Sequence, residues 1–315
     1  MNRCIIWGVG DEYEKTIDQI KFEELKGNLE VVALVTTKDR YYGETRDGYP
    51  LVRKNELQNL DYDFIIVLNT AHIEEIMQDI HALGIDRKKV INGKVFHMPL
   101  FDFERYISLV KNPVTILSDD CWGGHIYHSL CLPITSPTVN FGWPIDHFCK
   151  FMLDPFYYLA QPLQMKREGD FSGGGHYPIA TLGEKERQIE LHFTHAPTFS
   201  YMKERWERRK ARINPNRIFV KMALNDRYME KAPLDNTWSI EASLNAFKNV
   251  QYPKICFYCG ESKQKDVVFL KRFQADMYRT EATTFDYGYY IRGHRTKDID
   301  ILKLLNGEPD YLRQL

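Results

Sequence analysis

The chain has 315 residues, of which 43% are hydrophobic and 27% charged, and its formal net charge is −1. The length allows two domains, and the composition is that of an ordinary globular protein. A nearly neutral chain carries no strong overall field toward nucleic acid, so we expect no nucleic-acid partner. No apolar run reaches the ~20 residues of a membrane helix, and the first residues show no secretory signal. With cysteines at no framework spacing, these features predict a cytoplasmic protein with reduced thiols and no transmembrane segment.

Strand and helix patterns alternate through the first third of the chain. Short apolar runs predict strands at residues 3–9, 29–35, 64–68 and 90–91, and helical spacing predicts helices at 12–25, 72–83 and 101–110. Such alternation is typical of a parallel sheet with helices on its faces. The pair Asn112-Pro113 favours a boundary, because the residue before proline is disfavoured in a helix. We therefore predict an α/β fold with two domains, residues 1–110 and residues 111–315.

The second domain is less regular but also mixes strands with helices. Its predicted strands are residues 114–117, 189–193, 218–222, 255–258 and 267–270, and its predicted helices are residues 146–159, 199–213 and 299–305. Residues 168–178 contain three consecutive glycines and are interpreted as a loop. His176 at its end could close over a substrate, or the loop could be an ordinary surface segment.

A glycine-rich turn follows the first predicted strand. Gly8 and Gly10 match part of a dinucleotide-binding fingerprint, in which glycines allow the backbone to approach a pyrophosphate. Tyr13 stands at the third glycine position, and Asp39 is the only carboxylate suited to bind a ribose. Two interpretations stay open: a ligand-binding turn, or a turn of the same fold that holds no cofactor.

Two carboxylates, a thiol and two glycines gather after the strand at 114–117, in the segment Ser118–His125. Open α/β sheets bind their ligands where a strand ends before a helix, so this segment is the strongest candidate site. Asp119 and Asp120 could bind a divalent cation, but adjacent residues of an extended segment point to opposite faces. Gly123 and Gly124 could bring backbone N–H groups to a phosphate. Cys121 could instead be a nucleophile, or the segment a tight structural turn.

The predicted helix at 199–213 places several arginines on one flank. Arg205, Arg209 and Arg212 fall beside its apolar stripe, where guanidinium groups could grip a phosphate. A solvated cationic face is the alternative. His192 and His195 lie at the end of the preceding strand, where either could act as a general base. Cys256 and Cys259 have redox spacing but lie in an apolar run, so two structural thiols are expected.

Two resemblances to known families carry functional implications. Residues 4–91, with Gly48-Tyr49-Pro50-Leu51-Val52, look like the small Rossmann-like domain found beside sugar-modifying transferases, which implies nucleotide-sugar binding. Residues 114–269 resemble an uncharacterised bacterial family of exopolysaccharide biosynthesis proteins. The matching pieces are Ser118–Gly124, Ser136-Pro137-Thr138, Tyr177-Pro178, the segment from His192 to His195 and the segment from Trp206 to Asn214. Members of that family often carry asparagine where this chain has Asp119 and Asp120, which counts against an obligate metal site.

Three functions follow as hypotheses. The first is a transferase of exopolysaccharide biosynthesis that uses a phosphate-bearing, nucleotide-sugar-like donor, with or without a divalent cation, and that could form a homo-oligomer. The second is a non-catalytic nucleotide-sugar-binding or scaffolding protein, and the third is an NAD-dependent oxidoreductase. The residues predicted for catalysis are His192, His195, Asp120 and Cys121, and those predicted for ligand binding are Gly8, Gly10, Asp119, Trp122, Gly123, Gly124, His125, Arg205, Arg209 and Arg212.

Overall fold

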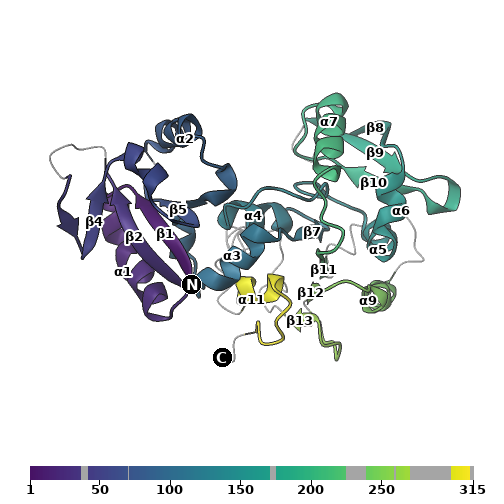
Figure 1. Cartoon of the computed structure of the whole chain (residues 1–315). Helices are drawn as coiled ribbons and strands as arrows, with labels where there is room; N and C mark the ends of the chain where they lie inside the picture. The colour runs from purple at the N-terminus through teal and green to yellow at the C-terminus, as the bar shows by residue number, and fades with distance from the viewer. Residues whose placement is uncertain are drawn as a thin grey trace. The chain divides into compact units, whose positions relative to one another are not determined.

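The structure, a computed structural model, describes residues 1–36, 42–69, 71–170, 175–224, 239–258, 260–269 and 299–312. Its fold is mixed α/β, which confirms the predicted fold class (Figure 1). The chain divides into two compact units, residues 1–111 together with 298–315, and residues 112–297. The C-terminal segment, expected in the second domain, belongs to the first unit instead.

A largely parallel sheet forms the centre of the first unit. Among the described residues its strand order is β3-β4-β2-β1-β5-β6. The strands are β1 (Asn2–Trp7), β2 (Leu29–Val35), β3 (Thr45–Arg46), β4 (Tyr49–Val52), β5 (Phe64–Val67) and β6 (Val90–Asn92). All neighbours are parallel except β3 and β4, which are antiparallel. Apolar runs form these strands because both faces of a parallel sheet are buried.

The helices of the first unit include those predicted, with small differences at their ends. They are α1 (Asp11–Leu25), α2 (Ile73–Ala82), α3 (Phe103–Lys111) and α11 (Ile301–Leu305), with 3-10 helices η2 (Lys54–Asn59), η3 (Arg87–Lys89) and η4 (Gly93–His97). Ile76 and Ile80 of α2 pack against Ile5, Trp7 and Ile65 of the sheet. The apolar stripe predicted for this helix therefore faces the core.

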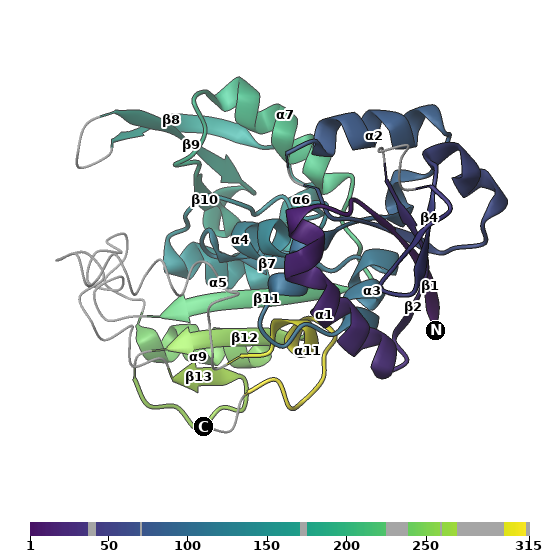
Figure 2. The same cartoon turned by 90° about the vertical axis from the view of Figure 1, so that its left-hand side faces the viewer.

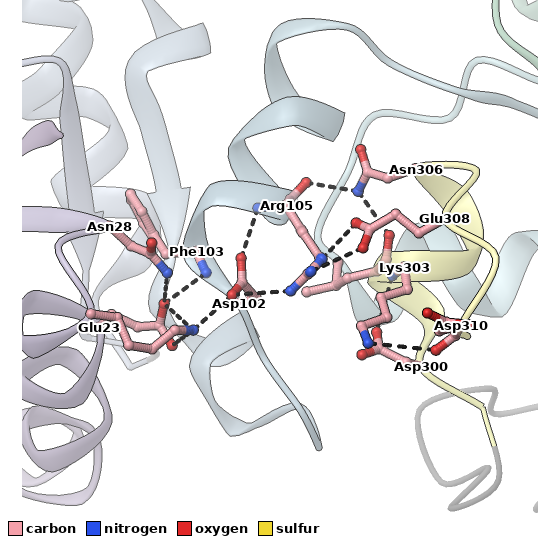
Figure 3. Close-up of polar contacts among 12 residues, drawn as sticks. Glu23, Asn28, Asp102, Phe103, Arg105, Asp300, Lys303, Asn306, Glu308 and Asp310 are labelled. Atoms are coloured by element: carbon pink, nitrogen blue, oxygen red, sulfur yellow. Dashed lines mark hydrogen bonds and ion pairs between the residues drawn. The ribbon is translucent and has the colours of Figure 1, made fainter. Parts of the chain in front are cut away.

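A polar network ties α1, α3 and the C-terminal segment together within the first unit (Figure 3). Arg105 of α3 forms a two-point pair with Glu308, at 2.6 and 2.9 Å, and the side-chain amide of Asn306 donates to the Arg105 carbonyl at 3.1 Å. The fully buried Glu23 of α1 accepts from the Phe103 backbone N–H at 3.0 Å. These bonds explain why the C-terminal segment belongs to this unit.

Substituting Glu23 by Ala tests the α1 end of this network. The change leaves the Phe103 N–H and the Asn28 side-chain amide, which donates to Glu23 at 2.7 Å, without their acceptor. An unsatisfied buried donor costs about 1–3 kcal/mol, and we expect a loss of that size in the free energy of unfolding, measured with urea. The exposed Glu74→Ala on α2 is the control and should change it by less than about 0.5 kcal/mol.

The second unit contains two sheets. Its parallel sheet has the order β13-β12-β11-β7 among the described residues (Figure 2), and its antiparallel sheet has the order β10-β9-β8. The parallel strands are β7 (Thr115–Ser118), β11 (Ile218–Leu224), β12 (Lys254–Tyr258) and β13 (Val267–Phe269). The antiparallel strands are β8 (Gln164–Asp170), β9 (His176–Leu182) and β10 (Ile189–His192). The helices are α4 (Trp122–Ser129), α5 (Ile145–Leu153), α6 (Pro155–Ala160), α7 (Phe199–Lys210) and α9 (Ile240–Asn249), with the 3-10 helix η5 (Lys185–Arg187).

Two sequence predictions for this unit are wrong. The helix expected over 146–159 is two helices, because Asp154 leaves the helical conformation and caps α6, which opens with Pro155. The loop expected over 168–178 is largely a β-hairpin, since β8 and β9 pair antiparallel. Charged side chains at 166–168 of β8 masked the strand pattern, because most of this strand is exposed. Gly173 and Gly174 lie outside the described residues.

Candidate functional site

The candidate site of the second unit lies where β7 ends and α4 begins. Ser118, the last residue of β7, pairs in register with Lys221 of the neighbouring parallel strand β11. Asp119, Asp120 and Cys121 then connect β7 to the first residue of α4. This strand-to-helix connection at the carboxyl edge of a parallel sheet is the expected place for a ligand.

Both aspartates pair with one buried lysine. The Nζ atom of Lys221 lies 2.8 Å from Oδ1 of Asp119 and 2.7 Å from Oδ1 of Asp120. Lys221 is 0% exposed and Asp119 is 3% exposed, and the Ala223 backbone N–H donates to the second oxygen of Asp119 at 2.9 Å. The expectation that the adjacent aspartates point to opposite faces is therefore wrong: the chain turns after β7, so it is not extended there.

Burial and mutual pairing shift the pKa values of Asp119 and Lys221. Burial raises the pKa of Asp119 to about 6, against the lowering effect of the Lys221 ammonium group, and Asp120 raises it further. Burial also opposes the charged form of Lys221, but the two carboxylates outweigh it and raise the pKa of this lysine. Lys221 is therefore a cation at neutral pH. Within the triad, two carboxylates face one ammonium group, so these three side chains together carry no excess positive charge.

The turn also brings a thiol and an imidazole together. Sγ of Cys121 lies 3.3 Å from Nε2 of His195, which stands in the turn after β10. Cys121 is half-buried and His195 is exposed, so a substrate can reach the pair from solvent. Burial and the Asp120 carboxylate raise the pKa of the Cys121 thiol to about 11. The thiol is therefore protonated at neutral pH, and a nucleophilic role requires His195 to remove its proton.

Gly123, Gly124 and Trp122 are in close contact with neighbouring parts of the core. A methyl group on Gly124 would collide with the Asn140 side chain and would lie 2.8 Å from a methyl carbon of Val139. On Gly123 it would lie 3.2 Å from side-chain atoms of β7. Trp122 is buried against Phe219 and Phe257. Close helix packing thus accounts for both glycines, and no ligand surface is formed by the Trp122 ring.

Gly124→Ala should therefore destabilise the second unit. Overpacking of a tight contact costs about 1–3 kcal/mol, and we expect a loss of this size because Asn140 and Val139 must both move. Gly142→Ala is the matched control in the same unit, since no atom lies within 4 Å of the added methyl group. Thermal unfolding of the two variants and the native protein gives the comparison; equal midpoints would contradict this account of Gly124.

The two predicted histidines have different surroundings. His192 makes a backbone bridge with Gly142, and its Nδ1 lies 3.2 Å from the Tyr177 hydroxyl. Its Nε2 lies 3.6 Å from Glu190, which also pairs with Lys166. Burial lowers the pKa of His192, so this ring is neutral at neutral pH. The structure therefore brings His195, rather than His192, to Cys121.

The arginines of α7 and Arg212, which follows the end of this helix at Lys210, have two kinds of surroundings. Arg209 is buried, and its guanidinium group donates to the Val139 carbonyl at 3.1 Å, so it anchors α7 to the segment that covers Gly124. Arg208 and Arg212 are exposed, and Arg205 is half-buried over the Tyr201 ring. Within the described ranges, no carboxylate forms an ion pair with these three arginines. His125 lies in α4, one turn after Cys121.

The glycine turn of the first unit has an acidic helix start. Gly8 has a φ of +115°, and a side chain there would meet the Leu68 carbonyl at 2.7 Å, so the close approach requires glycine. Gly10 precedes α1, whose first turn carries three carboxylates, Asp11, Glu12 and Glu14. Tyr13 is buried, donates to Asp47 at 2.8 Å and lies under Arg46. Carboxylates at this helix start would repel a phosphate.

The remaining residues singled out in the sequence either have a structural role or lie outside the described residues. Asp39 and Cys259 are outside the described residues, and Cys256 is buried in β12. His176 begins β9, and its Nδ1 lies 2.5 Å from Asp170 on β8. In the part of the chain that the structure describes, no group of three or more His, Cys, Asp or Glu side chains is arranged to hold a metal ion. Over those same residues, no helix has the length and apolarity needed to cross a bilayer.

Lys221 is the site residue that the sequence analysis missed. It stands in the middle of an otherwise apolar strand, Ile218–Leu224. Lysine is almost never fully buried unless it is paired, so a lysine in such a run is itself a signal for a buried carboxylate partner. The partners follow β7 rather than β11, which is why no local pattern shows them.

Comparisons with known proteins place this chain among uncharacterised relatives. A family model described as C2185-like, N-terminal, matches residues 1–91. An uncharacterized protein of Haemophilus influenzae is 28% identical over 123 residues, which are 39% of this chain and 55% of that protein. The chain thus spans about half the length of this curated relative. The model of the domain of unknown function DUF1919 matches residues 92–306, which is more than half of the chain, and the chain therefore belongs to the DUF1919 family.

Proposed function

We propose that the second unit is a transferase that works by covalent catalysis, with Cys121 as nucleophile and His195 as general base. The observation that carries the proposal is the 3.3 Å contact between Sγ of Cys121 and Nε2 of His195. The two residues are 74 positions apart in the chain, and a nucleophile beside a base is the recurring arrangement of thiol-dependent enzymes. Cys121 also stands at the start of α4, and a helix N-terminus favours a developing thiolate.

The chemistry that suits this pair is acyl transfer. His195 takes the thiol proton while Sγ attacks the carbonyl carbon of an acyl thioester. The bond between that carbon and the donor sulfur breaks, and the donor thiolate receives the proton from His195. An acceptor hydroxyl then attacks the acyl-cysteine, His195 accepts the hydroxyl proton, and the Sγ–carbon bond breaks. The proton returns to Cys121, so the enzyme is restored.

Charge around the site favours an acyl group over a sugar as the transferred group. Lys221 is matched by two carboxylates, so it offers nothing to stabilise a departing diphosphate. A thioester donor can still carry phosphates remote from its carbonyl. Arg205 and Arg208 on α7 and Arg212 just after its end could bind such phosphates, because arginine binds phosphate through two parallel hydrogen bonds. The acceptor that we propose is a hydroxyl of a polysaccharide precursor, in line with the family resemblance of the sequence.

The test uses acetyl coenzyme A as donor probe. The native protein should release free thiol, and peptide mass spectrometry should find one acetyl group on Cys121 when no acceptor is present. Neither signal should occur with Cys121→Ala. Thiol release that persists in Cys121→Ala, or an adduct at other cysteines alone, would refute the proposal for this donor class.

A second candidate function concerns the first unit. Its parallel strands have the order β4-β2-β1-β5-β6, which corresponds to strands 3-2-1-4-5 of the classic Rossmann order, with Gly8 at the point where the order reverses. We propose this point as a nucleotide-sugar site, although the acidic start of α1 is unfavourable to phosphate. Calorimetric titration with UDP-glucose tests it, with Gly8→Val expected to abolish any binding. The alternative function, an NAD-dependent oxidoreductase, would require binding of NADH. The carboxylates at the start of α1 are equally unfavourable to the phosphates of that cofactor.

A further inference from the structure

The buried lysine of β11 pairs with both aspartates of the turn that carries the thiol. We propose that Lys221 is a positioning residue, which holds the Asp119–Asp120 turn in place and sets the charge beside Cys121. Its importance for catalysis rests on the proposed function of Cys121. Its effect on the thiol itself can be measured without any substrate.

The contacts of Asp120 show how the turn is held. Its Oδ1 atom meets Nζ of Lys221 at 2.7 Å, accepts from the Trp122 backbone N–H at 2.9 Å and accepts from the Ser118 hydroxyl at 3.1 Å. Asp120 therefore ties the end of β7 to the first residue of α4, with Cys121 between them. Without the ammonium group, this oxygen would lose its ion pair with Lys221.

The charge balance around Cys121 depends on the same lysine. The carboxylates of Asp120 and Asp119 raise the pKa of the Cys121 thiol in addition to its burial, and the Lys221 ammonium group lowers it. Removing the ammonium group alone would leave two carboxylates beside the thiol. A buried ion pair is in general weak evidence for a stabilising role, because apolar replacements of the whole pair are often tolerated. The role proposed for this triad is therefore its electrostatic effect on the pKa of the Cys121 thiol, and not a gain in stability.

The experiment measures alkylation of Cys121 by iodoacetamide between pH 6 and pH 10, with each cysteine followed in its own peptide by mass spectrometry. In Lys221→Met, alkylation of Cys121 at pH 8 should be at least about tenfold slower than in the native protein, equivalent to a thiol pKa higher by one. The exposed Cys131 is an internal control and should react at an unchanged rate. Native-like rates at Cys121 across the whole pH range in Lys221→Met would overturn the proposal.

A charge-compensated variant separates the electrostatic effect from loss of folding. Asp119→Asn combined with Lys221→Met leaves Asp120 as the single charge of the triad, so the net charge equals that of the native site. Alkylation of Cys121 should return to within about threefold of the native rate, which is less than half a pKa unit. Should Lys221→Met fail to fold, a native-like rate in Lys221→Gln, measured on its folded fraction, would equally overturn the proposal. Absence of acyl transfer would refute the proposed function and leave these alkylation results unaffected.

Discussion

Cys121→Ala is expected to abolish acyl transfer, and His195→Gln to slow it by about two to four orders of magnitude. The thiol is the nucleophile of the proposed acyl intermediate, so its loss removes the proposed covalent route. His195 must remove a proton from a thiol whose pKa is raised to about 11 by burial and Asp120, so a glutamine in its place leaves the nucleophile protonated. Single-turnover measurements of thiol release at pH 7.5 give both rates.

Matched substitutions make this result specific to the pair. Cys131→Ala removes an exposed thiol, and His128→Gln removes an exposed imidazole of α4; both should leave the rate within about twofold of native. His192→Gln serves as a third comparison, because His192 faces Tyr177 and Glu190 rather than Cys121. If His195→Gln retained the full rate, His195 would not be the base, whatever the result for Cys121.

Lys221→Met is expected to cost about 3–5 kcal/mol in the free energy of unfolding of the second unit, because it leaves the buried Asp119 and the half-buried Asp120 without the Lys221 cation. Asp119→Asn in the same chain should recover part of the loss, since one of the two carboxylates is then neutral. Hydrogen exchange of peptides that cover β11 reports this unit separately from the first. Lys210→Met removes an i,i+3 pair with Glu207 on the exposed side of α7 and should change stability by less than about 1 kcal/mol.

The sign of the pH dependence gives this stability prediction an independent check. Burial raises the pKa of Asp119 to about 6 from an ordinary value of 3.8. A carboxyl group with a raised folded-state pKa contributes stability below pH 4 that is lost as pH rises toward 6. The stability of the native protein relative to Asp119→Asn should therefore fall over this range. If this stability difference rose with pH instead, the ion pair with Lys221, rather than burial, would have the larger effect on the pKa of Asp119.

Regular elements of the first unit were predictable because their signals are local. Buried parallel strands require continuous apolar runs, and residues 29–35 and 64–68 contain such runs. The stripe Ile73, Ile76 and Ile80 likewise predicted α2. The exposed strand β8 and the break at Asp154 were missed, because the first has charged residues where apolar ones are expected and the second depends on a cap.

The sequence by itself determined the α/β class, most of the buried parallel strands and the position of the strand-to-helix turn at Ser118–His125. These follow from hydrophobic periodicity and from glycine and proline positions, which act over a few residues. Only the tertiary structure decided that Cys121 meets His195, that Asp119 and Asp120 share Lys221, and that Arg209 serves packing. Asp119 and Asp120 meet Lys221 because β7 and β11 are neighbouring strands. The Cys121–His195 and Arg209–Val139 contacts join segments that are not paired in one sheet. All of these contacts depend on how distant parts of the chain pack together, which no local pattern contains.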